Sequence, residues 1–360
     1  MSLSRAVRLA APAFALLLPF AVAACERSEP DNPAQSQRAE TGLSRDAIER
    51  AVFTQPPPVP APVADDEAAP PTATAQPDPA VIRAQILLGR ARFSPGIIDG
   101  LGGENTSQAI AAFEKAAGLT EDGVLDADVF NRLTSADSSS VLADHVVTAQ
   151  DVEGPFIGTV PTDLEAMADL DRVGYANPLE ALAERFQMTE GLLQALNPGV
   201  DFATPQGLIG KTLIVAAVGP RALPGQVERI VVDKTERSVR AYDASDRLLA
   251  FYPATIGSEQ RPAPSGTLTV VGVANDPDYA YDPSRVTYDR GPRRVLVPPG
   301  PNNPVGSVWI ALSRDTYGIH GTPDPSKIAK TASNGCIRMT NWDAEQLAAA
   351  VRPGVEVQFV

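Results

Sequence analysis

A cysteine and a histidine lie close together near the C-terminal end of the chain, although both residue types are rare in it. The 360 residues include only two cysteines and two histidines. Cys336 follows Gly335 in a polar run, and His320-Gly321 lies sixteen positions before the cysteine. A thiol in a glycine-containing turn, preceded by a histidine at the end of a predicted strand, is typical of a nucleophile with its general base.

The expected chemistry follows from the proton on the thiol. An unperturbed cysteine has a pKa of about 8.5, so little of it is thiolate at neutral pH. A neighbouring imidazole can take that proton and later return it to a leaving group. His320 is the candidate base, and a core histidine that only packs is its alternative. His145 lies between predicted modules, where we expect a solvated surface residue. This chemistry needs no cofactor, and we predict no metal ligands.

The composition limits the class of partner. The formal net charge is −14 at pH 7, and the pI is near 4.7. Such an acidic chain is poorly suited to bind polyanions, so we expect no nucleic-acid partner. The length allows two or three domains of ordinary size.

Residues 1–24 are predicted to be an export signal. Arg5 and Arg8 form its basic start, and an apolar stretch at residues 10–24 follows. That stretch is too short and too rich in small residues to predict a membrane span. Its end, Val22-Ala23-Ala24-Cys25, resembles a bacterial lipoprotein cleavage site, which implies that Cys25 is lipidated. A plain signal peptide cleaved near Ala24 is the alternative.

The two cysteines are therefore assigned different roles. A lipidated Cys25 leaves Cys336 without a partner in the chain, and a single thiol in an oxidising compartment is a liability unless it is used. A disulfide between the two is the alternative. The predicted location is the periplasm, with a lipid anchor in a membrane. The outer membrane is favoured over the inner, because Glu26 is not the Asp that marks inner-membrane retention in some Gram-negative bacteria.

Three segments precede the region with the candidate site. Residues 25–79 form a Pro- and Ala-rich linker, with a short helix at most around residues 43–53, because such a composition buries too little apolar surface to fold. Residues 80–135 predict three helices separated by Asp-Gly turns, and they closely resemble a peptidoglycan-binding module. Residues 174–217 are similar to a LysM module, a strand-helix-helix-strand glycan binder. A generic two-helix connector is the alternative for this third segment.

Residues 227–360 predict an all-β domain with one helix. Short runs rich in β-branched and aromatic residues recur between Gly and Pro, which is typical of a sandwich or barrel. Thr340 and Asp343 form a capping-box pattern at the start of the helix. The predicted fold class of the whole chain is multidomain α+β: a three-helix wall-binding module, the LysM-like or connector segment, and the sandwich- or barrel-like catalytic domain.

This last domain resembles the L,D-transpeptidase (YkuD-type) catalytic domain. The family pattern is His-Gly, a spacer, then Ser/Thr-His-Gly-Cys-Ile-Arg, and the second part reads Ser333-Asn334-Gly335-Cys336-Ile337-Arg338 here. Pro264-Ser265-Gly266 and Asn303-Pro304-Val305-Gly306 match two further family motifs. One position departs, because Asn334 stands where the family usually has a second His.

The resemblance implies a role for each motif residue. Cys336 would attack the carbonyl of a meso-diaminopimelate residue in a tetrapeptide stem, expel D-alanine, and hand the acyl group to an amine. Arg338 would pair either with a substrate carboxylate or with a structural Asp such as Asp343. The remaining assignments are oxyanion or loop support for Gly335, Ser333, Asn334 and Gly321, and substrate binding for Tyr317 together with Arg338.

Three functions remain open at this point. The first is a transpeptidase that cross-links peptidoglycan or attaches proteins, including outer-membrane proteins, to the wall. The second is an L,D-carboxypeptidase or amidase, in which water replaces the amine. The third is a non-catalytic lipoprotein that tethers the membrane to peptidoglycan. Asn334 cannot shuttle a proton, but the family base is generally assigned to the first His, retained here as His320, so we predict an active enzyme.

Overall fold

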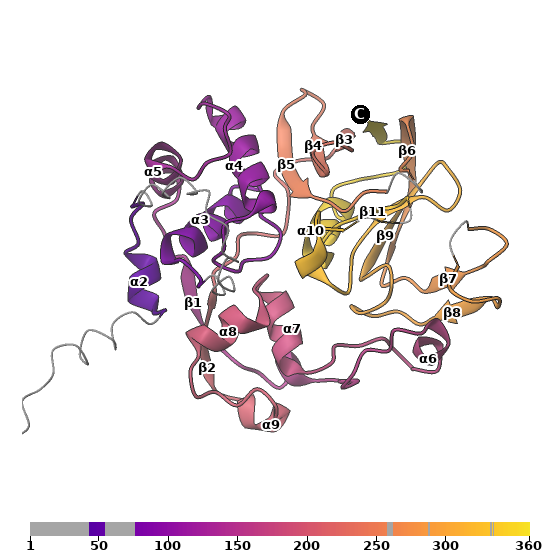
Figure 1. Cartoon of the computed structure of the whole chain (residues 1–360), viewed down its shortest axis with the longest axis horizontal. Coiled ribbons are helices and arrows are strands. Elements are labelled where there is room, and N and C mark those ends of the chain that lie inside the picture. The colour runs from indigo at the N-terminus through magenta and orange to yellow at the C-terminus, as the bar shows by residue number, and fades with distance from the viewer. Residues whose placement is uncertain (1–42, 55–75, 258–261, 287–288, 332, 334) are drawn as a thin grey trace, which may run out of the picture. The chain divides into compact units, whose positions relative to one another are not determined.

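A computed structural model describes residues 43–54, 76–257, 262–286, 289–331, 333 and 335–360 (Figure 1). The predicted signal peptide, Cys25, most of the predicted linker and Asn334 lie outside these residues. From residue 43 onward the chain forms one compact unit. In this described portion, no helix has both the length and the apolar character that crossing a membrane requires.

Three helices form the first module: α3 (Pro79–Arg90), α4 (Glu104–Ala117) and α5 (Ala127–Ala136). Asp78 caps α3 by accepting hydrogen bonds from two backbone N–H groups, and Asp126 caps α5 in the same way from one. Each helix buries one apolar face against the others, as the helical spacing of their apolar residues predicts. The three predicted helices are confirmed.

The predicted linker contains a packed element at its centre. Helix α2 (Arg45–Glu49) places Ile48 in the core, where it is fully buried. The Glu49 carboxylate accepts backbone N–H bonds from Val141 and Leu142. Residues 43–54 are therefore part of the folded unit rather than spacer, because burial of one isoleucine alone stabilises the fold by about 1.5–3 kcal/mol.

The second module is built around two antiparallel strands, β1 (Leu142–Val146) and β2 (Thr212–Ala216). Between them lie η1 (Gln150–Val152), α6 (Leu164–Ala168), α7 (Pro178–Arg185), α8 (Glu190–Leu196) and α9 (Pro205–Leu208). The predicted range 174–217 lacked β1, which lies thirty residues before it. His145 is on β1 and only partly exposed, because its ring packs against Phe186 and its Nε2 contacts Asp151 Oδ2 at 2.9 Å.

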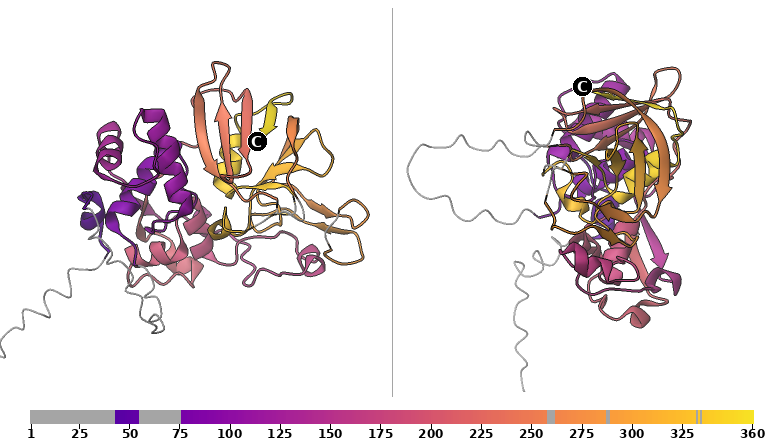
Figure 2. Two further views of the ribbon diagram at one scale, coloured as in Figure 1. Left: turned by 45° about the horizontal axis from the view of Figure 1, so that its top comes forward. Right: turned by 90° about the vertical axis from the view of Figure 1, so that its right-hand side faces the viewer.

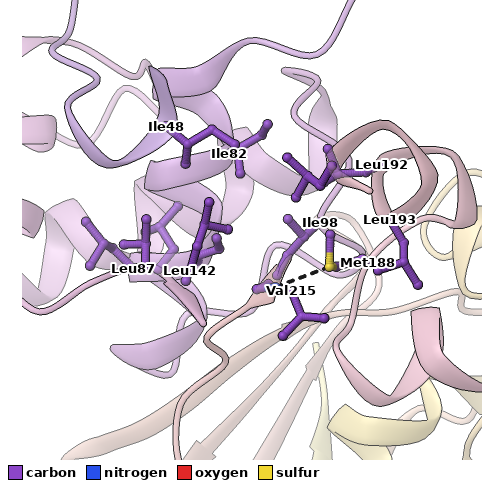
Figure 3. Packing of buried hydrophobic residues seen from close by; sticks show 14 of the residues in the cluster. Ile48, Ile82, Leu87, Ile98, Leu142, Met188, Leu192, Leu193 and Val215 are labelled. Carbon is purple, nitrogen blue, oxygen red and sulfur yellow. Dashed lines mark hydrogen bonds between the residues drawn. The ribbon is translucent and has the colours of Figure 1, made fainter. Parts of the chain in front are cut away.

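These two modules share one hydrophobic core. Backbone hydrogen bonds join them, because Ile98 of the first module donates to the carbonyl of Gln187 and accepts the N–H of Thr189. Within the second module, Met188 Sδ accepts the N–H of Ala216 at 3.3 Å. Figure 3 shows side chains from both modules in contact; it labels Ile48, Ile82, Leu87, Ile98, Leu142, Met188, Leu192, Leu193 and Val215.

The C-terminal domain, from residue 227 onward, is built on an eight-stranded mixed sheet with the order β11-β10-β9-β6-β12-β3-β4-β5. The strands are β3 (Arg229–Asp233), β4 (Ser238–Tyr242), β5 (Leu248–Pro253), β6 (Gly266–Asn275), β9 (Val308–Leu312), β10 (Gly318–His320), β11 (Ile337–Arg338) and β12 (Glu356–Phe359). Residues 266–269 of β6 pair with β12 and residues 270–275 pair with β9, with a bulge between Val270 and Gly272 in the second part. The sheet curls at this strand (Figure 2), in agreement with the predicted sandwich- or barrel-like class.

A separate hairpin, β7 (Tyr279–Tyr281) with β8 (Val295–Val297), lies beside this sheet. Its buried side chains form a small core with Leu164 and Met167 of α6. An ion pair between Arg293 and Glu165 joins the same two elements. The long insertion between β1 and α7 therefore holds the hairpin in place.

The first module also completes the edge of the large sheet. Phe251 of β5 donates its N–H to the carbonyl of Arg92, and its own carbonyl accepts the N–H of Ser94, both at 2.9 Å. One helix, α10 (Asn341–Ala348), packs against β9 and β10 (Figure 1). Thr340 caps it as predicted, through the N–H of Asp343 at 3.2 Å.

Candidate active site

Strands β10 and β11 bring the candidate base and nucleophile to one face of the sheet. They pair in parallel, with Ile319 opposite Ile337 and His320 opposite Arg338. Side chains two residues apart on a strand share a face. Cys336 immediately precedes β11, and by this alternation we expect its side chain on the face that carries Arg338 and His320. The parallel pairing explains why the two motifs, sixteen positions apart in the sequence, form one site.

His320 is held as a neutral imidazole. Its side chain is buried, and its ring stacks on Trp309 with centroids 5.5 Å apart. Nδ1 lies 2.7 Å from the Gly321 carbonyl oxygen, which only accepts, so Nδ1 carries the proton and Nε2 is the basic nitrogen. Burial lowers the pKa of His320 to about 3, helped by the charge of Arg338 and opposed by hydrogen bonds to the backbone of Gly321 and Val305.

The Cys336 thiol is protonated at neutral pH. It points at the carbonyl oxygen of Thr316, at a long 3.6 Å, and the backbone of Gly318 hydrogen-bonds the sulfur. Burial raises the pKa of the thiol, and that effect exceeds the stabilisation of the thiolate by Gly318 and Arg338. Cys336 is a free thiol in this structure.

The loop before the thiol is braced by a serine. Ser333 Oγ donates to the carbonyl of Cys336 at 2.5 Å and accepts the N–H of Gly335 at 3.2 Å. Both bonds lie within the loop that contains Ser333, as the predicted role of loop support implies. Gly335 has a φ of +106°, and a Cβ there would lie 3.1 Å from the Tyr317 ring. The backbone at this position therefore requires glycine, and its N–H is engaged by Ser333 rather than turned toward an oxyanion.

Tyr317 and Arg338, the two predicted substrate-binding residues, differ in whether their side chains have interaction partners. The guanidinium of Arg314 stacks over the Tyr317 ring, 4.7 Å from its centroid. Arg338 Nε is buried and has no hydrogen-bond partner among the described residues. The proposed pairing of Arg338 with Asp343 is not formed: Asp343 Oδ2 accepts a bond from Ser94 Oγ at 2.9 Å instead. Among the described residues, no acidic side chain forms an ion pair with Arg338.

Sequence reasoning missed several residues that touch this site, including Trp309, Thr316 and Asn341. Asn341 lies behind the catalytic turn. Its buried amide accepts the N–H groups of Ser307 and Thr322, at 3.2 and 3.0 Å, directly behind the His320-Gly321 turn. The available signal was indirect. A glycine in each of the motifs ending at Gly306 and Gly321 indicates that some group approaches the backbone closely.

Comparison with known proteins agrees with these observations. Residues 227–358 match the model of the L,D-transpeptidase catalytic domain (YkuD), and residues 77–133 match the model described as "Putative peptidoglycan binding domain". The chain is 33% identical over 182 residues to the "Putative L,D-transpeptidase YkuD" of Bacillus licheniformis, covering 50% of this chain and 92% of that protein. It is 35% identical over 190 residues to the "Probable L,D-transpeptidase ErfK/SrfK" of Salmonella typhimurium, covering 51% of this chain and 59% of that protein.

The similarity to solved structures is low. L,D-transpeptidase 3 from Mycobacterium tuberculosis, solved with a faropenem-derived adduct, has 16% identity and a TM-score of 0.31, covering 42% of this chain and 65% of that one. The assignment therefore rests on the sequence matches. This chain has a YkuD catalytic domain and, before it, a peptidoglycan-binding domain. The sequence matches show that the chain belongs to the L,D-transpeptidase family of transferases.

Proposed function

We propose that the chain is a cysteine-dependent L,D-transpeptidase that acts on peptidoglycan tetrapeptide stems. Cys336 is the nucleophile and His320 is its general base. The observation that carries this proposal is the parallel pairing of β10 with β11, which sets the strand of the buried His320 beside the strand that Cys336 immediately precedes. A protonated thiol beside a neutral imidazole is the reactant state that general-base catalysis needs.

The proposed reaction has two acyl transfers. In the first, His320 takes the thiol proton while sulfur attacks the carbonyl carbon of the third stem residue. The C–N bond to D-alanine then breaks, and the proton from His320 goes to the departing amine. In the second, an acceptor amine attacks the thioester, gives a proton to His320, and forms a new amide. The proton returns to sulfur as the C–S bond breaks.

Arg338 has a place in this scheme because no acidic side chain among the described residues forms an ion pair with it, although Asp324 lies near enough to act on its charge. A stem peptide carries carboxylates, and a guanidinium binds a carboxylate through two parallel hydrogen bonds. The buried Nε of Arg338 has no hydrogen-bond partner among the described residues, so these residues do not use the full donor capacity of the guanidinium. Arg338 therefore anchors a substrate carboxylate on the face that carries the thiol.

The group that attacks the thioester, an amine or water, decides whether the chain is a transpeptidase or an L,D-carboxypeptidase. Purified disaccharide-tetrapeptide, incubated with the full-length chain and with Cys336→Ala, is analysed by mass spectrometry. A cross-linked dimer that depends on Cys336 supports the transpeptidase. Tripeptide with free D-alanine and no dimer identifies an L,D-carboxypeptidase instead. Products that persist in Cys336→Ala would contradict the nucleophile assignment.

The proposed location follows from residues outside the described ones. A lipid on Cys25 would hold the protein at a membrane facing the periplasm, with the outer membrane favoured, and would bring the peptidoglycan-binding domain within reach of the wall. Cys25→Ser should release the protein into the soluble periplasmic fraction. A variant that stays membrane-bound and unprocessed would show that residues 1–24 are an uncleaved anchor.

A further inference from the structure

We propose that Asn341 is a positioning residue for His320, and that Glu184 of helix α7 fixes the orientation of the Asn341 amide. The inference rests on the proposed function only in taking His320 as the base. Asn341 is the first residue of α10 and is 1% exposed. It reaches between the catalytic domain and the second module, and it contacts no reacting group.

The Asn341 amide uses all of its hydrogen-bonding capacity. Its Oδ1 accepts the N–H groups of Ser307 and Thr322. Its Nδ2 donates to Glu184 Oε1 at 2.9 Å and to the carbonyl of Pro301 at 3.2 Å. A side-chain amide has two acceptor sites and two donor hydrogens, so none remains for another partner. Such a fully satisfied buried group specifies a single local geometry.

The two motif glycines make this contact possible. A Cβ on Gly306 or on Gly321 would lie 2.1 Å from Asn341 Oδ1 in either case. Any side chain at these positions would displace the amide oxygen. The glycine of the His-Gly motif is thus explained by packing from behind the turn, rather than by a contact with substrate.

One peptide unit links Asn341 to the catalytic ring. The carbonyl of Gly321 accepts the bond from His320 Nδ1, and the N–H of the same peptide unit, on Thr322, donates to Asn341 Oδ1. The C=O and N–H of a trans peptide point in opposite directions in one rigid plane. Asn341 therefore holds one end of a plane whose other end selects the Nδ1–H tautomer of His320 and leaves Nε2 as the base.

Glu184 determines which way the amide faces. A carboxylate oxygen and the Pro301 carbonyl both accept, so the NH2 group of Asn341 must turn toward them. Rotated by half a turn, the amide would set its NH2 group against the N–H groups of Ser307 and Thr322. Because Glu184 belongs to α7, the second module contributes directly to the order of the catalytic turn.

A nearby asparagine supplies a matched control. Asn302 is also 1% exposed, and its Nδ2 donates to Glu180 Oε1 on α7 at 2.8 Å and to the carbonyl of Gly174 at 3.0 Å. It resembles Asn341 in burial and in its link to α7, but it forms no hydrogen bond with the His320 turn. Loss of Asn302 therefore reports the cost of breaking the contact between modules alone.

The experiment measures the tautomer of His320 directly. The full-length chain, labelled with ¹⁵N in histidine, is compared by NMR with Asn341→Ala and with Asn302→Ala; because the chain has two histidines, His145→Gln assigns the signals. In the natural protein and in Asn302→Ala, Nδ1 of His320 should be the protonated nitrogen. In Asn341→Ala, the two nitrogens should show averaged signals, and kcat should fall about tenfold to 100-fold with little change in KM.

A second pair of variants tests whether the effect of Asn341→Ala comes only from a general loss of folding. Asn341→Asp keeps the acceptor for Thr322 but sets a second carboxyl group against Glu184, whose pKa burial raises to about 7. Well above that pH, where both groups are charged, the change should disturb the tautomer. Adding Glu184→Gln reverses donor and acceptor across the contact and should restore the signal at least partly. Any of three results would overturn the proposal. The tautomer of His320 could be unchanged in Asn341→Ala, or Asn302→Ala could alter the tautomer and kcat as much as Asn341→Ala does. The Asn341→Asp, Glu184→Gln double variant could also fail to recover the tautomer signal. An inert chain that still shows the tautomer shift would instead contradict the proposed function.

Discussion

The two sides of the candidate site differ in how completely their polar groups are satisfied. Behind His320, every polar group of the Asn341 amide is paired, and the ring itself is stacked and hydrogen-bonded. Around Cys336, the sulfur has one long hydrogen bond to Thr316 and one to the backbone of Gly318, and Arg338 Nε has no partner among the described residues. In the proposed reaction, the base would be held in advance, whereas the nucleophile side would be completed by the substrate.

The largest expected effect comes from removing the nucleophile. Cys336→Ala should abolish product formation, because no other thiol is available in the described residues. The half-buried side chain contributes little packing, so the melting temperature should change little. Intact-protein mass spectrometry should show one thiol-directed inhibitor, including a carbapenem, attached to the natural protein and none to the variant. An adduct at another residue would contradict the assignment.

The next largest loss of activity is expected on the His320 side of the site, where the polar groups are fully hydrogen-bonded. His320→Ala should lower kcat by about 10²–10⁴-fold, the usual contribution of general acid–base catalysis. Steady-state kinetics on disaccharide-tetrapeptide provides the measurement, with His145→Ala as the matched control because His145 lies on β1, outside the site. A loss below tenfold would mean that another group takes the thiol proton.

On the Cys336 side of the site, a change at Arg338 should mainly weaken substrate binding. Arg338→Gln removes a charge that the described residues do not neutralise, and it should raise KM or lower kcat/KM by about tenfold to 100-fold, the range for a charge-assisted hydrogen bond of about 1.5–3 kcal/mol. A substrate with its carboxylates amidated should lose the same factor with the natural protein and nothing further with the variant. Equal losses on both substrates with the variant would assign Arg338 a structural role.

The pH dependence tests the protonation states of both sides together. Because burial raises the pKa of Cys336, its alkylation by iodoacetamide should accelerate about tenfold per pH unit through the neutral range. Because burial lowers the pKa of His320 to about 3, no inflection from that ring should occur near pH 6.5. A rate already at its plateau by about pH 7 would show a thiolate–imidazolium pair instead.

The smallest effect is expected at the position that departs from the family. If His320 is the only base, Asn334→His should change the rate by a few-fold at most, because proton transfer accounts for a much larger factor. The same kinetic assay applies, with His320→Ala as the reference for losing the base. An inert natural protein that Asn334→His activates would favour the tether function.

Local patterns predicted those elements whose signals are local. Helices α3, α4 and α5 have caps and apolar faces that can be read from the sequence, and β3 to β6 are recognisable runs of β-branched and aromatic residues. Strand β1 was missed because its partner, β2, lies about seventy residues away, and long-range pairing leaves little trace in a five-residue segment. Ile48 was assigned to linker because its burial depends on α3 and not on its own neighbours.

The same distinction applies to the site. Cys336, His320 and Ser333 lie in short motifs, so residue types and spacing were sufficient to find them. Asn341 and Glu184 are 157 positions apart, and each alone is an unremarkable helix residue. Arg338 was recognised, but its missing partner was not, because an unpaired atom can only be identified once the surrounding side chains are in place.

The contact of residues 92–94 with β5 has a consequence for dissecting the protein. Strand β5 ends the large sheet, and the backbone bonds of Phe251 to Arg92 and Ser94 occupy groups that would otherwise be exposed. An uncovered sheet edge is a template for strand addition by other molecules. We therefore expect a catalytic domain truncated at residue 227 to be prone to self-association. In the full-length chain, the peptidoglycan-binding domain would reduce aggregation by covering this edge.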